Sequence, residues 1–265
     1  MKNRLVFCSD HIKEGFSLDD AIKYSISNNS FLEVHGVHFK ELFLLKKIHP
    51  IIAIHPHWRD YSLSTDDNKY FRKSIDYLKN LIDFISKNDI KYLILHPEGY
   101  PVNLDKETRY EIVIGAFQQL SKYINKNDNI TILLENMPPA KIYSPSDLPD
   151  YYIGEKLKDL FQILNINTKI EFLFDLGHFI CAHNIYGDKE IKDLEKFDKK
   201  LTYVHVHDNN GKINNHEPLS REETIKILEK IEEKYNPLYS LEVSPSIENL
   251  NKSIRILKKL NIKFL

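Results

Sequence analysis

Short apolar runs alternate along the chain with longer amphipathic stretches. The short runs have the length of buried strands, and the longer stretches repeat apolar residues with the spacing of a helix. The runs that we interpret as strands lie at residues 5–9, 31–35, 51–55, 91–96, 130–135, at the start of 172–180, 202–207 and 238–243. The stretches that predict helices lie at residues 17–26, 41–48, 70–86, 106–124, 153–164, 188–196, 220–234 and 246–260. Ser17 is expected to cap the first of these helices.

Eight pairs of a strand followed by a helix are the number found in a (β/α)8 TIM barrel. The chain has 265 residues, which suits one such barrel, and it contains no convincing linker or low-complexity segment. We therefore predict an α/β fold and a single TIM-barrel domain that covers residues 1–265. An open, doubly wound sheet is the structural alternative.

The apolar runs end in histidine, aspartate or glutamate. In the stretch F-L-F-D-L-G-H-F-I at residues 172–180, Asp175 and His178 follow a buried run. Five other runs end in the same way, at residues 52–57, 92–97, 131–136, 203–208 and 240–245. Because residues just past the carboxyl ends of barrel strands line one shared face, we expect these side chains to form a site.

Histidine nitrogens and carboxylate oxygens are ligands of divalent ions such as zinc and manganese. For any single residue a packing role is the simpler interpretation. A group of such residues without a metal would, however, bury several unpaired carboxylates, each at a considerable free-energy cost. We therefore predict a divalent-metal site, whose candidate ligands are His57, His96, Glu135, Asp175, His178, His205, His216 and Glu242.

The overall charge limits the classes of partner. The formal net charge is -1, so the chain has no global positive field that would attract nucleic acid or an anionic membrane. Cys8 and Cys181 are too few for a disulfide framework, which favours a reducing compartment. We find no signal peptide and no apolar run of about 18 residues. We expect a cytoplasmic protein without a membrane partner, and a homodimer stays an open alternative.

The order of the motifs resembles a known family. From about residue 50 to 245 the chain shows H-P-H, L-H-P, E-N, D-x-x-H, H-x-H-D, N-x-H-E-P-L and L-E. This order is similar to that of the xylose-isomerase-like TIM-barrel superfamily, which contains endonuclease IV and many sugar or sugar-phosphate isomerases and epimerases. In endonuclease IV nine residues hold three zinc ions, and the eight candidates above match eight of them. The ninth, an aspartate in that enzyme, is Asn214 here, and an amide oxygen is a weaker ligand.

Two departures from the nuclease pattern argue against an abasic-site nuclease. The chain has F-C-S-D-H-I-K-E-G at residues 7–15 where the nuclease carries G-x-H-x-S, and it has P-L-S-R-E at 218–222 where the nuclease carries L-G-E-G. The loop with Trp58, Arg59 and Tyr61 could wedge into DNA. We favour instead a lid over a small cavity, in which Trp58 covers a sugar face and Arg59 holds a phosphate. DNA thus stays the weaker alternative.

The resemblance implies two mechanisms that share Glu135. In an isomerase or epimerase, Glu135, Asp175, His205 and Glu242 would hold one ion. Glu135 and Glu242 would be the catalytic residues, transferring a proton through a metal-stabilised enediolate, while His178 and Asn214 would contact the sugar or sugar phosphate. In an endonuclease IV-like phosphoesterase, His57, His96 and His216 would complete a site for several ions. We predict the isomerase or epimerase, with one to three zinc or manganese ions per chain, and keep the phosphoesterase as the alternative.

Several other polar residues receive no role from the sequence. His205 and His207 share one face of their strand, so only one of them needs to reach the metal. Glu33, His35 and His38 follow the second strand, and no motif supports a function for them. Asp10 and His11 follow the first strand and are only candidates for the edge of the site.

Overall fold

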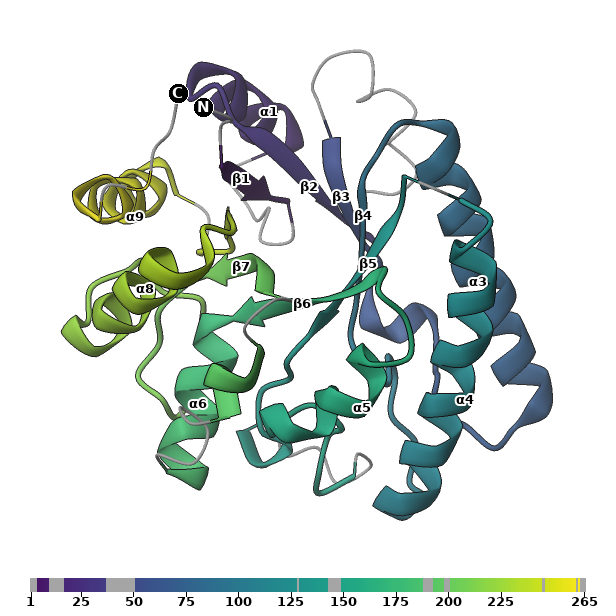
Figure 1. Ribbon diagram of the computed structural model, residues 1–265. Coiled ribbons are helices and arrows are strands. Elements are labelled where there is room, and N and C mark those ends of the chain that lie inside the picture. Colours follow the sequence, from purple (N-terminus) through teal and green to yellow (C-terminus); the bar gives the residue numbers. More distant parts are fainter. Residues whose placement is uncertain are drawn as a thin grey trace.

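The computed structural model describes residues 4–9, 17–36, 51–127, 129–142, 149–187, 193–197, 201–244, 246–260 and 262. Within these residues eight parallel strands form a closed barrel in the order β1 to β8 (Figure 1). The last strand pairs with the first, and Val6 lies opposite Ser240. This closure confirms the α/β class and the (β/α)8 TIM barrel, and it excludes the open sheet. That the whole chain forms one domain stays a prediction.

The strands are short, as the apolar runs predict. Their bounds are β1 Leu5–Cys8, β2 Phe31–His35, β3 Ile51–His55, β4 Tyr92–Leu95, β5 Thr131–Glu135, β6 Ile170–Asp175, β7 Leu201–Val206 and β8 Leu238–Leu241. Most of their residues are buried on both faces, because the barrel interior covers one face and the surrounding helices cover the other. Parallel pairing places all eight carboxyl ends at the same end of the barrel.

The α-helices are α1 Leu18–Ser27, α3 Asn68–Lys87, α4 Lys106–Ile124, α5 Leu160–Leu164, α6 Leu176–Tyr186, α8 Glu222–Tyr235 and α9 Ile247–Lys259. Short 3-10 turns lie at η2 Trp58–Asp60, η3 Ala140–Ile142, η4 Leu157–Asp159 and η5 Glu195–Phe197. In Figure 1 the helices surround the barrel, and α3 and α4 run side by side against it. Ser17 caps α1 as predicted: its hydroxyl accepts a hydrogen bond from the Asp20 amide, and the Asp20 carboxylate accepts one from the Ser17 amide.

Around β6 the structure differs from the prediction. The helix that follows β6 begins directly at Leu176, whereas we predicted a helix at 188–196, of which residues 188–192 lie outside the described part of the chain. The stretch 172–180 is apolar on both sides of Asp175, so its pattern does not separate strand from helix. Asp175 makes the division, because its carboxylate accepts a hydrogen bond of 2.6 Å from the His178 amide and caps α6.

Two other predicted helices need comment. The helix predicted at 153–164 is shorter than expected, since its regular part is η4 followed by α5. The helix predicted at 41–48 lies outside the described residues, as do Asp10, His11 and His38.

The core has two layers that position the site. A small apolar cluster fills part of the barrel interior. It consists of Val6, Ala53, Tyr92, Ile94, Leu133, Leu173 and Tyr203. A larger cluster fills the space between the strands and the helices. Burial of these side chains supplies most of the driving force for folding. Toward the carboxyl ends, the interior positions change from apolar to His, Asp and Glu. Polar chemistry is therefore concentrated at one end of a rigid barrel.

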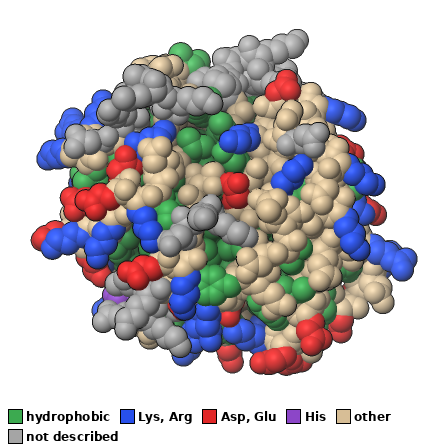
Figure 2. Space-filling view, in the orientation of Figure 1, with side chains coloured by type: hydrophobic (Ala, Val, Ile, Leu, Met, Phe, Trp, Pro, Cys, Tyr) green, Lys and Arg blue, Asp and Glu red, His purple; other side chains and the backbone are tan. Residues whose placement is uncertain are grey.

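The face of the molecule in Figure 2 carries Lys and Arg side chains interspersed with Asp and Glu side chains. This distribution agrees with the formal net charge of -1. On this face the charge pattern is typical of a solvated surface.

Candidate metal centre

A cavity of about 270 Å³ lies at the carboxyl ends of the strands. Its lining includes nine of the predicted site residues, which are His57, Trp58, Arg59, His96, Glu135, His178, Asn214, His216 and Glu242. Asp175 and His205 are fully buried beside this lining. The structure therefore brings the predicted residues to one end of the barrel, where they surround a single cavity.

At the floor of the cavity lies a compact set of four side chains, which we call the central group: Glu135, Asp175, His205 and Glu242. One oxygen or nitrogen from each lies within 4.8 Å of the others. His205 Nδ1 is 3.1 Å from Glu242 Oε2, 3.3 Å from Glu135 Oε1 and 3.6 Å from Asp175 Oδ2. Three buried carboxylates at such distances repel one another unless a positive charge lies between them.

The pKa values of the central group follow from this crowding. Burial raises the pKa of Glu135, but attraction by His205 and His96 outweighs it and leaves the pKa well below its ordinary value. Burial raises the pKa of Glu242 well above its ordinary value in spite of His205. Burial lowers the pKa of His205, but Glu33, Glu242 and Glu135 reverse the effect and leave the pKa well above its ordinary value. The group therefore favours a positive charge at its centre.

A second set, the lateral group, consists of His55, His96 and Glu135. Glu135 Oε2 lies 3.4 Å from His55 Nε2 and 3.3 Å from His96 Nε2, while its other oxygen faces the central group. Both His55 nitrogens and Glu135 Oε2 are buried and make no hydrogen bond with the described residues. Such atoms are typical of a site that an ion completes.

The lateral group contains His55, which the sequence analysis did not select, and it lacks His57. The Nδ1 atom of His57 accepts a hydrogen bond from the Arg59 amide, and the His57 ring stacks on Trp58. His55 is the last residue of β3, two positions after the interior residue Ala53, so its side chain points into the barrel. This alternation is a signal that could have found His55. His57 as a metal ligand stays a prediction.

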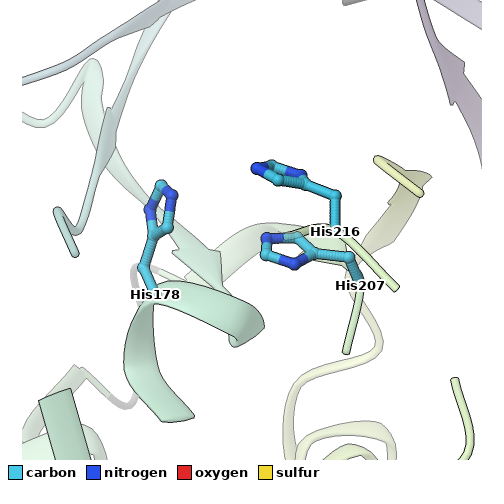
Figure 3. A group of neighbouring side chains, drawn as sticks. All are labelled: His178, His207 and His216. Atoms are coloured by element: carbon cyan, nitrogen blue, oxygen red, sulfur yellow. The ribbon is translucent and has the colours of Figure 1, made fainter. Parts of the chain in front are cut away.

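A third set, the three-histidine group, consists of His178, His207 and His216 (Figure 3). The His207 and His216 rings stack with centroids 4.0 Å apart, and the His178 ring at the start of α6 faces them. His178 Nδ1 lies 2.8 Å from the Asn136 carbonyl oxygen, and His216 Nδ1 lies 2.9 Å from that of Glu242. If each Nδ1 donates, the Nε2 atom of each ring carries the lone pair, which is the form in which a histidine binds a metal ion.

The sequence analysis required only one of His205 and His207 at the metal, and the structure places both in candidate ligand groups. His205 belongs to the central group, whereas His207 lies just past the end of β7 and joins the three-histidine group. Asn214, which replaces the aspartate of the nuclease pattern, lies next to the same group, with Nδ2 3.0 Å from His216 Nε2. His207 thus adds an imidazole to a group beside which Asn214 offers an amide in place of the aspartate of the nuclease pattern.

Glu33 is the other residue that the sequence analysis missed. It lies within β2, is fully buried, and its carboxylate faces both His205 and His55. Burial raises its pKa, but His205 and His55 outweigh burial and leave the pKa well below its ordinary value. Glu33 lies within a strand and belongs to no recognisable motif, so the sequence analysis gave it no role.

At the mouth of the cavity Trp58, Arg59 and Tyr100 form a layer. The Trp58 and Tyr100 rings stack with an interplanar angle of 12°, and the Arg59 guanidinium carbon lies 4.7 Å from the Trp58 ring centroid. Tyr61 does not belong to this layer, because it is fully buried and its hydroxyl bonds the His96 backbone. The Tyr61 ring is therefore not exposed with Trp58 and Arg59 in the loop that the sequence analysis considered as a wedge for DNA.

Among the described residues, the helices are all too short or too polar to cross a bilayer.

Comparison with known proteins places the barrel in a family. Residues 40–260 match the sequence pattern of the xylose isomerase-like TIM barrel family. The chain is 28% identical over 158 residues to the uncharacterized protein MJ1614 of Methanocaldococcus jannaschii, a match that covers 59% of this chain and 55% of that protein. The chain therefore matches about half the length of this relative.

Two solved structures show the same fold. A D-tagatose 3-epimerase-like protein superposes with a TM-score of 0.77 at 20% identity, covering 97% of both chains. A D-psicose 3-epimerase in the presence of D-fructose superposes with a TM-score of 0.73 at 13% identity, again covering 97% of both chains. With its closed barrel and a family match over most of its length, the chain belongs to the xylose isomerase-like TIM barrel family.

Proposed function

We propose that the protein is a divalent-metal-dependent isomerase or epimerase of a sugar or sugar phosphate. The observation that carries the proposal is the central group. Two of its members, Glu135 and Glu242, line the cavity, where a substrate could reach them. Membership of the family and the likeness to a D-psicose 3-epimerase support a ketose as the substrate class.

The residues of the central group fit a divalent ion. They offer three carboxylates and one imidazole, a donor set that suits manganese or zinc. Glu135 Oε2 and His205 Nδ1 are buried atoms without a hydrogen bond among the described residues, as expected if an ion satisfies them. Glu135, Asp175, His205 and Glu242 would hold the ion.

When bound, the ion would polarise a substrate carbonyl and the neighbouring hydroxyl, which makes the adjacent C–H bond more acidic. Glu135 and Glu242 would then act as a pair of proton acceptor and proton donor on the two sides of the substrate. A bound ion displaces the proton of Glu242, so both carboxylates are then ionised and either one can act as the proton acceptor.

The remaining cavity residues would bind the substrate. His178 and Asn214 line the same cavity as the two glutamates and offer hydrogen bonds to hydroxyl groups. Trp58 presents a ring suited to the apolar face of a sugar, and Arg59 presents a guanidinium suited to a phosphate. The layer that they form with Tyr100 would also exclude water from the reacting atoms.

The test is metal analysis followed by a proton-exchange assay. We would measure bound metals by inductively coupled plasma mass spectrometry, then incubate the loaded protein with ketoses and their phosphates in D₂O and follow loss of substrate C–H signals by NMR. Glu135→Gln keeps the shape of the side chain but removes the base, so exchange should fall by about 10²- to 10⁴-fold while the fold persists. A folded Glu135→Gln protein with full exchange activity would reject the mechanism.

A second candidate is metal-dependent phosphoester hydrolysis of the endonuclease IV type. The observation that favours it is the presence of the lateral and three-histidine groups beside the central group, which together provide places for more than one ion. Two or three zinc ions per chain, with cleavage of an abasic-site DNA duplex and no exchange on any ketose, would establish this candidate instead. About one ion with C–H exchange would establish the isomerase or epimerase.

A further inference from the structure

Glu33 makes contacts that its place in the sequence does not suggest. Its Oε2 atom accepts a hydrogen bond of 2.8 Å from the Tyr203 hydroxyl and lies 3.1 Å from His205 Nε2. Its Oε1 atom lies 3.5 Å from His55 Nδ1 and 3.3 Å from Cys8 Sγ. The residue is fully buried, so its carboxylate depends on these partners for its hydrogen bonds.

His55 and His205 each lie between two glutamates. One nitrogen of each ring faces Glu33, and the other faces Glu135: His205 Nδ1 is 3.3 Å from Oε1 of Glu135, and His55 Nε2 is 3.4 Å from its Oε2. The four side chains therefore form a closed ring in which the carboxylates alternate with the imidazoles. Glu33 lies on the side of β2, and Glu135 lies on the side of the cavity.

The contacts of His205 select one of its tautomers. An ionised carboxylate only accepts hydrogen bonds, so His205 Nε2, which lies 3.1 Å from Glu33 Oε2, must carry the hydrogen. His205 Nδ1 is buried and makes no hydrogen bond with the described residues, so in the neutral imidazole its lone pair points toward the carboxylates of the central group. His55 makes no hydrogen bond to either glutamate, so its contacts do not select a tautomer.

We propose that Glu33 is a positioning residue of this site: it fixes His205 as the Nε2–H tautomer, so that Nδ1 presents a lone pair to the central group beside Glu135. The inference rests on the proposed metal-dependent function, since it concerns how the chain presents ligands to the ion. It also makes Glu33 the link between the central and lateral groups on the side away from the cavity.

A purely structural role for Glu33 predicts different behaviour. If Glu33 served only to bond Tyr203, removal of either partner would lower stability and leave the metal ligands unchanged. Tyr203→Phe is the matched control, because it removes the hydroxyl that donates to Glu33 and leaves both histidines in place. Glu33→Gln keeps the size of the side chain but replaces one oxygen by an amide group that donates hydrogen bonds.

The experiment uses Co²⁺ titration of the metal-free protein, with visible absorption as the readout, for the wild type and both variants. We expect Glu33→Gln to weaken Co²⁺ binding by about tenfold to a hundredfold and to alter the absorption bands, as loss of a hydrogen-bond partner of a ligand does. Tyr203→Phe should bind Co²⁺ like the wild type. A folded Glu33→Gln protein with wild-type affinity and spectrum would overturn the proposal.

A second measurement needs no variant. Two-dimensional ¹⁵N NMR of the zinc-loaded wild type distinguishes the two tautomers of each histidine. Finding Nε2–H at His205 supports the proposal, and finding Nδ1–H there overturns it. The opposite tautomer in a protein that binds metal and exchanges ketose C–H would leave the proposed function standing, whereas a wild type that binds no divalent ion would remove the proposed function itself.

Discussion

The Nε2 atom of His207 lies 3.1 Å from both carboxylate oxygens of Asp175. Asp175 belongs to the central group and His207 to the three-histidine group, so this contact joins the two. Glu135 belongs to both the central and the lateral group, and one of its oxygens faces each group. The three groups are therefore parts of one connected set of ligands, and a change in one histidine is expected to affect its neighbours.

The first prediction concerns Gly177, against which the His207 ring packs. A Cβ atom built on Gly177 would lie 1.8 Å from His207 Cε1, and no such contact is tolerated. Gly177→Ala should therefore displace His207, lower stability by about 1–3 kcal/mol and reduce metal binding at the three-histidine group. Thermal unfolding and metal analysis test this.

The matched control is Gly115→Ala in α4, where the added Cβ would meet no atom within 4 Å. Because alanine favours a helix more than glycine does, this variant should be as stable as the wild type or more stable by up to about 1 kcal/mol. Equal stability and metal content in the Gly177→Ala and Gly115→Ala proteins would show that the His207 ring is not held in this position.

The second prediction separates the two histidines of the H-P-H motif. His55→Ala should lower the bound metal, because His55 faces Glu135, and His96→Ala should do the same from the other side of the lateral group. His57→Ala should change metal content less, since the His57 ring packs on Trp58 and bonds the Arg59 amide. Metal analysis of the three purified variants gives the answer, and a larger loss for His57→Ala than for His55→Ala would contradict the structure.

The third prediction concerns pH. The pKa values of Glu242 and His205 are both raised, so without an ion each holds its proton to a higher pH than usual. A divalent ion must displace these protons, and protonated ligands compete with it. Apparent metal affinity should therefore rise with pH until both groups have lost their protons. Isothermal titration calorimetry in buffers of different ionisation enthalpy should detect the released protons, and an affinity independent of pH would exclude this competition.

The fourth prediction concerns the mouth of the cavity. Trp58→Ala removes the ring that stacks on Tyr100 and lies under Arg59, so substrate binding should weaken. We expect KM to rise about tenfold, with a smaller change in kcat, because the ring would supply binding surface and is not one of the groups that would transfer the proton. Trp58→Phe keeps an aromatic surface and should recover most of the loss. Steady-state kinetics on the ketose identified by the exchange assay would test this, and a change confined to kcat would refute a binding role.

The sequence by itself determined the class of fold and the end of the barrel that carries the chemistry. Repeated apolar runs followed by amphipathic stretches specify parallel strands with helices outside, because each strand is buried on both faces. Polar residues at the ends of the runs then converge, since parallel strands share one carboxyl end. Glu135, Asp175, His205 and Glu242 could be found in this way, and the structure brings them together.

Only the tertiary structure decided which neighbouring histidines share a group and where β6 ends. His55 and His57 are two residues apart, as are His205 and His207, and spacing alone does not say how the chain turns after each strand. His57 turns into a 3-10 segment beside Trp58, whereas His207 continues past β7 onto Gly177. The role that we propose for Glu33 follows from its contact with His205, a residue distant in the sequence. Such contacts depend on barrel closure, a property of the whole chain that no local pattern contains.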